Sequence, residues 1–242
     1  MPSTPKWLVS NLLAVTAAFL LTTLSPVATI AAEAPAATGS GAAASTMPAN
    51  TPATTYVEGK HYRIVSTPVR TSDPHRIEVT EVFWYGCSHC FSFEPLVEKW
   101  SHTLPPDVVL VRSPAIWHPT MELHARAFYT AKALGVLDKL HQPLYEALNL
   151  RKAKLASEQE IAELFVANGV PLDNFTKTFN SFGVTSAIKQ ADGRQRGYQV
   201  EGTPEMVVNG KYRVTAAMAG GQEEMLKVVD FLIAQERKGT SP

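Results

Sequence analysis

Residues 81–95 read EVFWYGCSHCFSFEP and contain both cysteines of the chain, Cys87 and Cys90. Residues 76–85, which end inside this stretch, are rich in β-branched and aromatic side chains and predict a buried strand. Gly86 ends the strand, and the residues from Cys87 onward predict a helix. The cysteine pair therefore lies where a strand gives way to a helix.

Two cysteines three residues apart on one helical turn bring their sulfur atoms close enough to bond, which allows several interpretations. A structural disulfide here would close a very short loop and remove little entropy from the unfolded chain. A metal site could draw three donors from Cys87, His89 and Cys90, but consecutive helical residues point in different directions and no second CxxC is present. A redox-active pair is the third interpretation.

The redox interpretation agrees best with the position of Cys87. At a helix N-terminus, unpaired backbone N–H groups and the helix dipole stabilise a thiolate. His89 can add a positive charge or a hydrogen bond to the same sulfur. A stabilised thiolate favours the reduced form, so the disulfide becomes a stronger oxidant. Cys90 lies deeper in the helix and is predicted to be the resolving thiol, in a reaction that needs no metal and no cofactor.

The N-terminal residues indicate export. Residues 1–31 combine a lysine near the start, an apolar stretch and small residues at a cleavage zone, as in a secretory signal peptide. An uncleaved membrane anchor is the alternative, although the apolar stretch is short for a membrane span. Residues 32–55 are rich in Ala, Pro and Thr and predict a flexible linker. A lone CxxC in an exported protein is expected to be catalytic, because no other cysteine takes part in the fold.

Composition excludes a charge-driven partner. The chain has 242 residues, 45% of them hydrophobic, and a formal net charge of zero. No global electric field therefore draws it to nucleic acid or to anionic lipid. After a second predicted strand at 107–112, the pattern is helical as far as residue 198. The strand pattern then returns in EMVV and KYRV, which flank the hairpin dipeptide Asn209-Gly210, and an amphipathic helix follows. This order predicts an α/β fold with a helical insertion.

Five stretches carry a resemblance to a known family: YVEGKHYRIVSTPV, EVFWYGCSHCFSFEP, ALGVLDKLHQPLYEAL, FVANGV and EGTPEMVVNGKYRV. They resemble the DsbA family of periplasmic thiol:disulfide oxidoreductases, and the resemblance covers nearly the whole folded part. It implies a thioredoxin fold with an inserted all-helical domain. The thioredoxin domain would comprise residues 56–118 and 199–238, and the insertion residues 119–198. Members of this family are known for a low cysteine pKa and an oxidising couple, so the resemblance implies both.

The resemblance also implies roles for residues outside the CxxC motif. Pro204 matches a cis-proline beside the disulfide, and the backbone at Thr203 could pair with an extended substrate strand. Glu81, Glu94 and Arg112 match a buried charge cluster beneath the active site. In that cluster Glu81 would take up or relay the proton of the resolving thiol, with a pKa raised by burial.

Two positions depart from the best-known oxidase of the family. The dipeptide between the cysteines is Ser88-His89 where that enzyme has Pro-His, and Thr203 stands where it has Val. Both positions tune the redox couple and the release of substrate. These departures leave open a less oxidising enzyme, or one with some isomerase character.

The sequence as a whole predicts a periplasmic thiol:disulfide oxidase that donates its disulfide through a mixed disulfide at Cys87. The resemblance implies reduced exported proteins as substrates and a quinone-linked membrane reoxidant of the DsbB type. We expect a monomer with no nucleic-acid partner. A disulfide reductase or isomerase of the same fold is the alternative enzyme, and a metal-binding or chaperone module is the alternative from another class.

Overall fold

The computed structural model describes residues 56–239. The predicted signal peptide (1–31) and linker (32–55) lie outside these residues. The described part contains a five-stranded sheet, with helices between its strands and after the last one. The elements are β1 (Arg63–Ile64), β2 (Ile77–Phe83), α1 (Ser88–Ser101), β3 (Val108–Pro114), α2 (Pro119–Ala133), α3 (Leu137–Asn149), α4 (Glu158–Ala167), α5 (Leu172–Phe179), α6 (Phe182–Tyr198), β4 (Glu205–Val208), β5 (Tyr212–Thr215), α7 (Ala216–Ala219) and α8 (Gln222–Gly239).

The sheet has the strand order β1-β5-β4-β2-β3. β2 runs parallel to β3 and antiparallel to β4, and β5 is antiparallel to both β4 and β1. All seven residues of β2 are buried, as expected for a strand covered on both faces. The register places Glu81 of β2 opposite Arg112 of β3 and Met206 of β4. An acid and a base that are distant in the sequence therefore become neighbours.

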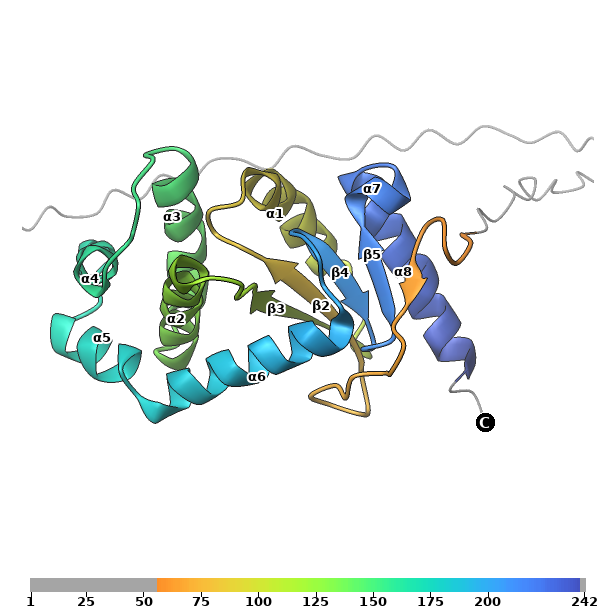
Figure 1. Ribbon diagram of the computed structural model, residues 1–242, viewed down its shortest axis with the longest axis horizontal. Helices are drawn as coiled ribbons and strands as arrows, with labels where there is room; N and C mark the ends of the chain where they lie inside the picture. The colour runs from red at the N-terminus through yellow and green to blue at the C-terminus, as the bar shows by residue number, and fades with distance from the viewer. Residues whose placement is uncertain (1–55, 240–242) are drawn as a thin grey trace, which may run out of the picture. The chain divides into compact units, whose positions relative to one another are not determined.

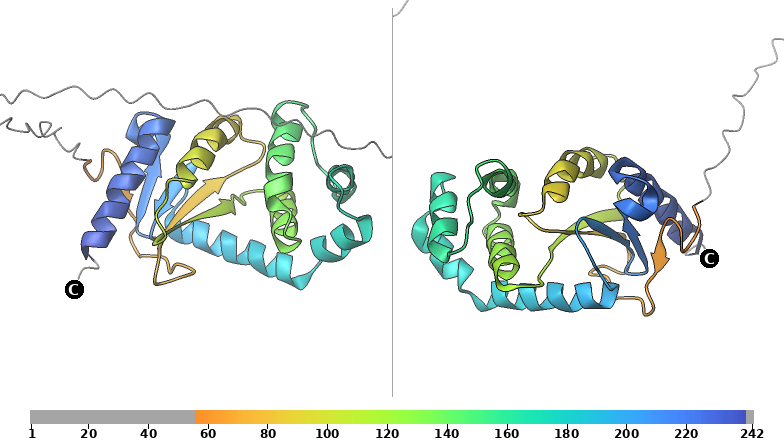
Figure 2. Two further views of the ribbon diagram at one scale, coloured as in Figure 1. Left: turned by 180° about the vertical axis from the view of Figure 1, so that it is seen from behind. Right: turned by 45° about the horizontal axis from the view of Figure 1, so that its top comes forward.

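Helices cover both faces of the sheet (Figures 1 and 2). Alternate residues of β2 point to opposite faces. Val79 packs in one cluster with Val97 of α1 and Val228 of α8. Val82 packs on the other face with Tyr198, the last residue of α6. The helix that carries the cysteines is thus fixed on the sheet by its own apolar side.

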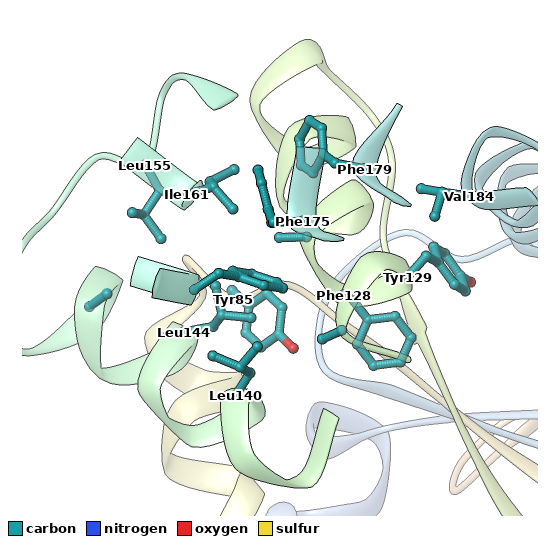
Figure 3. Packing of buried hydrophobic residues seen from close by; sticks show 14 of the residues in the cluster. Tyr85, Phe128, Tyr129, Leu140, Leu144, Leu155, Ile161, Phe175, Phe179 and Val184 are labelled. Atoms are coloured by element: carbon teal, nitrogen blue, oxygen red, sulfur yellow. The ribbon is translucent and has the colours of Figure 1, made fainter. Parts of the chain in front are cut away.

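The helices between β3 and β4 enclose a second core (Figure 3). Leu140, Leu144, Ile161 and Phe175 are fully or almost fully buried in this core. Tyr85, which follows β2, inserts its ring among these helical residues and contacts the Tyr145 ring edge-on at 4.9 Å between centroids. The turn before the cysteines is therefore held by the sheet and by the inserted helices together.

Most predicted elements are confirmed, with small changes at their ends. The strand predicted at 76–85 is shorter, and the helix predicted from Cys87 begins at Ser88 with Cys87 as its N-cap. The hairpin is confirmed: Asn209 and Gly210 both have positive φ values, 48° and 64°, as a tight two-residue turn requires. Strand β1 and helix α7 were not predicted, because both are very short. Across residues 56–239, no helix combines the length and the apolar character needed to cross a bilayer.

Candidate active site

The turn between β2 and α1 places Cys87 at the start of the helix. The backbone N–H of Cys87 donates to the Trp84 carbonyl at 3.0 Å, which closes the turn. A side chain at Gly86 would overlap the Trp84 indole ring, so the close approach requires glycine. Cys87 has extended backbone angles (φ −87°, ψ 116°) and occupies the N-cap position. Its sulfur therefore faces the free N–H groups of the first helical turn.

Hydrogen bonds lower the pKa of the Cys87 thiol to about 5. The largest contribution is a hydrogen bond with the Cys90 thiol; burial acts in the opposite direction, and the Thr203 side chain and the backbone N–H groups of Cys90 and His89 lower the pKa further. The Cys90 N–H lies 3.3 Å from the Cys87 sulfur. Both cysteines are free thiols in this structure, and Cys87 is the partly exposed one. At neutral pH the sulfur of Cys87 is consequently an anion.

Cys90 has the opposite character. Its side chain is fully buried, and burial raises the pKa of its thiol, as do the hydrogen bond with Cys87 and the negative charge there. The two sulfurs of one helical turn are thus an accessible thiolate and a buried thiol. This asymmetry fits a pair in which Cys87 reacts with other molecules and Cys90 resolves the product.

The loop before β4 approaches the same sulfur from the other side of the site. The Thr203–Pro204 peptide bond is cis, and the Thr203 carbonyl lies 3.4 Å from the Cys87 sulfur, where it accepts from the thiol when protonated. A groove of about 490 Å³ opens beside this loop. Its walls come from the first turn of α1, the loop before β4, and the region from the end of β5 to the start of α8: His89, Glu201, Gly202, Thr203, Pro204, Glu205, Thr215, Ala216, Ala217, Gly221 and Gln222.

A cluster of buried charges lies further along α1. Arg112 of β3 contacts three carboxylates, those of Glu94 at 2.6 Å, Glu98 at 3.0 Å and Glu81 at 3.4 Å. His141 of α3 lies 3.3 Å from the second oxygen of Glu94. The other ring nitrogen of His141 hydrogen-bonds to the Tyr85 hydroxyl at 2.7 Å. The cluster thus joins the sheet, the cysteine helix and the inserted helices.

The two buried acids of this cluster titrate differently. Burial raises the pKa of Glu81 to about 8, the charge of Glu94 raises it further, and Arg112 only partly opposes both. Burial also acts on Glu94, but the hydrogen bond with His141 and the charges of His141 and Arg112 outweigh it and lower the pKa of Glu94. Near neutral pH the cluster therefore holds an ionised Glu94 and a Glu81 that can gain or lose a proton.

The predicted site residues fall into two groups in space. Cys87, Cys90, Thr203 and Pro204 meet at the start of α1, with Ser88 and His89 exposed beside them. Glu81, Glu94 and Arg112 meet in the charge cluster. His89 is predicted to add a positive charge or a hydrogen bond to the Cys87 sulfur, and its backbone N–H lowers the Cys87 pKa. His89 also lines the groove.

Sequence reasoning missed three polar residues of the site region, His141, Glu205 and Arg213. His141 lies on the apolar side of α3, four residues before Tyr145, and that spacing was the available signal. Glu205 and Arg213 are buried charges within apolar strands. Among the described residues, no group of three His, Cys, Asp or Glu side chains is arranged to hold a metal ion.

Comparison with known proteins points to one family. Residues 107–232 match the model of the DSBA-like thioredoxin domain. The chain is 43% identical over 182 residues to the thiol:disulfide interchange protein DsbA of Pseudomonas aeruginosa, covering 75% of this chain and 86% of that one. It is 42% identical over 179 residues to the DsbA of Azotobacter vinelandii, covering 74% and 84% of the two chains.

Solved structures show the same fold. The crystal structure of Pseudomonas aeruginosa DsbA superposes with a TM-score of 0.74 at 43% identity, covering 76% of this chain and 96% of that one. The structure of the oxidoreductase DsbA from Xylella fastidiosa gives a TM-score of 0.71 at 29% identity, covering 76% and 98%. The predicted fold class, a thioredoxin fold with a helical insertion, is confirmed.

Proposed function

The chain belongs to the DsbA family of thiol:disulfide oxidoreductases, and from this membership and the chemistry of its cysteine pair we propose that it donates its Cys87–Cys90 disulfide to reduced exported proteins. The observation that supports this most is the Cys87 sulfur, which is partly exposed and has a pKa lowered to about 5. A thiolate stabilised in this way favours the reduced enzyme, so the disulfide has a driving force to be transferred.

The reaction begins from the disulfide form. A substrate thiolate attacks the Cys87 sulfur, the Cys87–Cys90 bond breaks, and a mixed disulfide forms between substrate and Cys87. The Cys90 sulfur leaves with the electron pair of that bond. A second substrate thiolate then attacks the substrate sulfur of the mixed disulfide. The substrate leaves oxidised, and Cys87 is released as a thiolate whose pKa is about 5, which makes it a good leaving group.

The departing Cys90 sulfur needs a proton, because burial raises the pKa of this thiol. Glu81 is the proposed source, as a buried acid whose pKa is raised to about 8. Arg112 and Glu94 form the ion pair beside it and keep a fixed positive charge near both acids. In the reverse direction, when the enzyme is reoxidised, Glu81 takes the proton back.

The groove beside Thr203 is the proposed binding site for substrate. An extended peptide would lie along the backbone before Pro204, with its cysteine directed at the Cys87 sulfur. Ser88 and His89 are exposed at the mouth of the site and would contact the substrate next to its cysteine. Main-chain pairing makes binding tolerant of sequence, as a general oxidase requires.

The N-terminal residues and the family support a proposal for the location, the domains and the partner of the enzyme. We propose that residues 1–31 direct export to the periplasm and that residues 32–55 are a linker. Residues 56–118 with 199–238 would form the thioredoxin domain and residues 119–198 the insertion. The protein would act as a monomer, and a quinone-linked membrane protein of the DsbB type would restore the disulfide.

Equilibration with glutathione tests this function. The purified reduced protein is incubated in glutathione buffers of graded potential, and the dithiol fraction is measured by thiol labelling. We expect a couple more oxidising than the glutathione pool, together with rapid oxidation of a reduced two-cysteine peptide by the disulfide form. A couple as reducing as that of thioredoxin would identify a reductase and contradict the proposal.

Two serine variants separate the roles of the cysteines. Cys87→Ser should abolish peptide oxidation completely, because no mixed disulfide can form. Cys90→Ser should also lack a disulfide to donate, but its Cys87 thiolate should attack an oxidised peptide and accumulate a mixed disulfide visible by mass spectrometry. Oxidation of peptides by Cys87→Ser at the wild-type rate would rule out the assignment.

A further inference from the structure

The loop that presents Thr203 to Cys87 is fastened by a buried acid that the reaction described above does not use. Glu205 follows Pro204 directly and is only 2% exposed. One of its carboxylate oxygens accepts the backbone N–H of Gly202 at 2.8 Å and that of Glu201 at 3.1 Å. The carboxylate thus binds the two residues immediately before Thr203.

The other oxygen of Glu205 forms an ion pair with the neighbouring strand. Arg213 of β5 is 5% exposed and lies 3.2 Å from Glu205 through its Nε atom. A terminal nitrogen of the same guanidinium donates to the Glu201 side chain at 2.7 Å. Glu201, Glu205 and Arg213 therefore form a closed ring of contacts around Gly202, and we refer to these three side chains as the loop clamp.

We propose that Glu205 is a positioning residue of the oxidase, which through the loop clamp holds the Thr203 carbonyl and hydroxyl against the Cys87 sulfur and keeps the loop backbone ready to pair with substrate. This rests on the proposed function, since it concerns the same site. The 3.4 Å approach of the Thr203 carbonyl to the Cys87 sulfur shows how close the loop lies. The contact that stabilises the thiolate, and that the clamp must maintain, is the hydrogen bond from the Thr203 side chain, which lowers the Cys87 pKa.

Energetics favour a positioning role. Burying a carboxylate is unfavourable unless hydrogen bonds and a counter-charge compensate. Here two N–H donors and one guanidinium do so, although burial still raises the pKa of Glu205. Both N–H donors belong to the loop, so the compensation and the loop geometry depend on each other. A neutral glutamine would retain an acceptor oxygen for the loop, whereas alanine would leave both N–H groups without it.

A matched control exists on the same sheet. Glu78 of β2 is also 2% exposed and also accepts a loop N–H, that of Ser72, at 2.9 Å. It lies at the opposite end of β2 from the cysteines. Substitution of Glu78 removes a buried carboxylate of the same kind without touching the Thr203 loop.

The decisive quantity is the rate of oxidation of a reduced peptide divided by the rate of reaction with glutathione. Glutathione makes few backbone contacts, so its reaction rate depends little on the Thr203 loop. The ratio therefore reports on the loop and not on whether the protein as a whole remains folded. Glu205→Ala should lower the ratio about five- to tenfold, the loss expected for one or two net hydrogen bonds, and should raise the Cys87 pKa. Glu205→Gln should stay within about twofold of wild type for the same reason, and Glu78→Ala should leave the ratio unchanged.

Three results would overturn the proposal: an unchanged ratio in folded Glu205→Ala, an equal fall in Glu78→Ala, or a glutamine variant as impaired as the alanine variant. If Glu205→Ala does not fold, amide hydrogen exchange of the wild-type protein decides. The Glu201 and Gly202 amides should be protected, and exchange at the rate of an unstructured peptide would contradict the clamp. Failure of the wild-type protein to oxidise peptides would instead contradict the proposed function. The two failures can be told apart, because amide protection and the Cys87 pKa are measured independently of activity.

Discussion

The first turn of α1 and its second turn both hold a negative charge, but by different means. At the first turn, the Cys87 thiolate is stabilised by hydrogen bonds from a thiol, from Thr203 and from backbone N–H groups. At the second turn, the buried Glu94 carboxylate contacts a full cation, Arg112, at 2.6 Å, and His141 at 3.3 Å. The sulfur anion remains partly exposed, whereas the carboxylate is shielded.

The difference shows what each arrangement is suited for. Neutral donors stabilise an anion while leaving one side of it open to an attacking or leaving group. A buried carboxylate needs a counter-charge, because removal from water costs several kcal/mol per ion. The charge cluster can therefore store and release a proton at Glu81, while the helix start performs the exchange of sulfur bonds.

Removing the Arg112 cation tests the stabilisation of the buried charge cluster. It should have the largest effect on the free energy of unfolding. Arg112→Met leaves the acids of the cluster without their shared partner, so we expect a loss of about 3–5 kcal/mol in the free energy of unfolding. Denaturant unfolding of the reduced protein measures it. Arg196→Met is the control, because Arg196 is exposed and pairs with Asp192 at 2.7 Å on the surface; its loss should stay below about 1 kcal/mol. Equal losses in the two variants would show that the buried cluster contributes no more to stability than an exposed ion pair does.

Neutralising Glu81 should stabilise the protein at high pH. The folded-state pKa of Glu81 is raised to about 8 from an ordinary value of 4.5. The wild type therefore loses stability as the pH rises from the lower value to the higher one. Glu81→Gln should be more stable than wild type by about 4 kcal/mol at pH 8 and no more stable at about pH 4. A pH-independent difference would contradict a raised pKa.

The same variant bears on the proposed proton transfer. Glu81→Gln cannot supply a proton to Cys90, so peptide oxidation by the disulfide form should slow about 10²-fold, the lower end of the range for a single acid–base contribution. Cys87 should keep its low pKa. An unchanged rate would leave Glu81 with a purely structural role.

Changing Thr203 tests the stabilisation of the partly exposed Cys87 thiolate. Among these substitutions, it should have the smallest effect. Thr203→Val removes the hydroxyl but keeps the carbonyl that lies 3.4 Å from the Cys87 sulfur. Loss of one side-chain hydrogen bond, worth about 1 kcal/mol, should raise the Cys87 pKa by roughly one pH unit. The couple should shift accordingly. Thr215→Val, at another residue that lines the groove, is the control and should leave the pKa unchanged.

Local sequence was sufficient to predict the cysteine end of α1. A β-rich stretch, a glycine and a cysteine that opens a helix place Cys87 at an N-cap without knowledge of the rest of the chain. The contact with Thr203 spans 116 residues along the chain, and only the family resemblance led to it. The pairing of Glu81 with Arg112 likewise depends on the parallel register of β2 and β3, which spacing alone does not fix.

The loop clamp and His141 were beyond local sequence for the same physical reason. Glu205 and Arg213 each look like a single charge in a short apolar strand, and their complementarity emerges only when β4 and β5 pair. His141 contacts Glu94 and Tyr85, which belong to other elements, so its own neighbours in the sequence do not reveal its role. A charged or polar residue within an otherwise apolar strand or helix face therefore indicates that a buried polar partner should be sought elsewhere in the chain.

In the reduced protein, Cys87 is a thiolate at neutral pH, and the proposed chemistry depends on this charge. Titration of the ultraviolet thiolate absorbance of the reduced protein, with Cys87→Ser as the blank, measures this directly. We expect a single transition at a pKa of about 5 that is absent from the serine variant. A transition near 9, the value of an ordinary cysteine thiol, would contradict it.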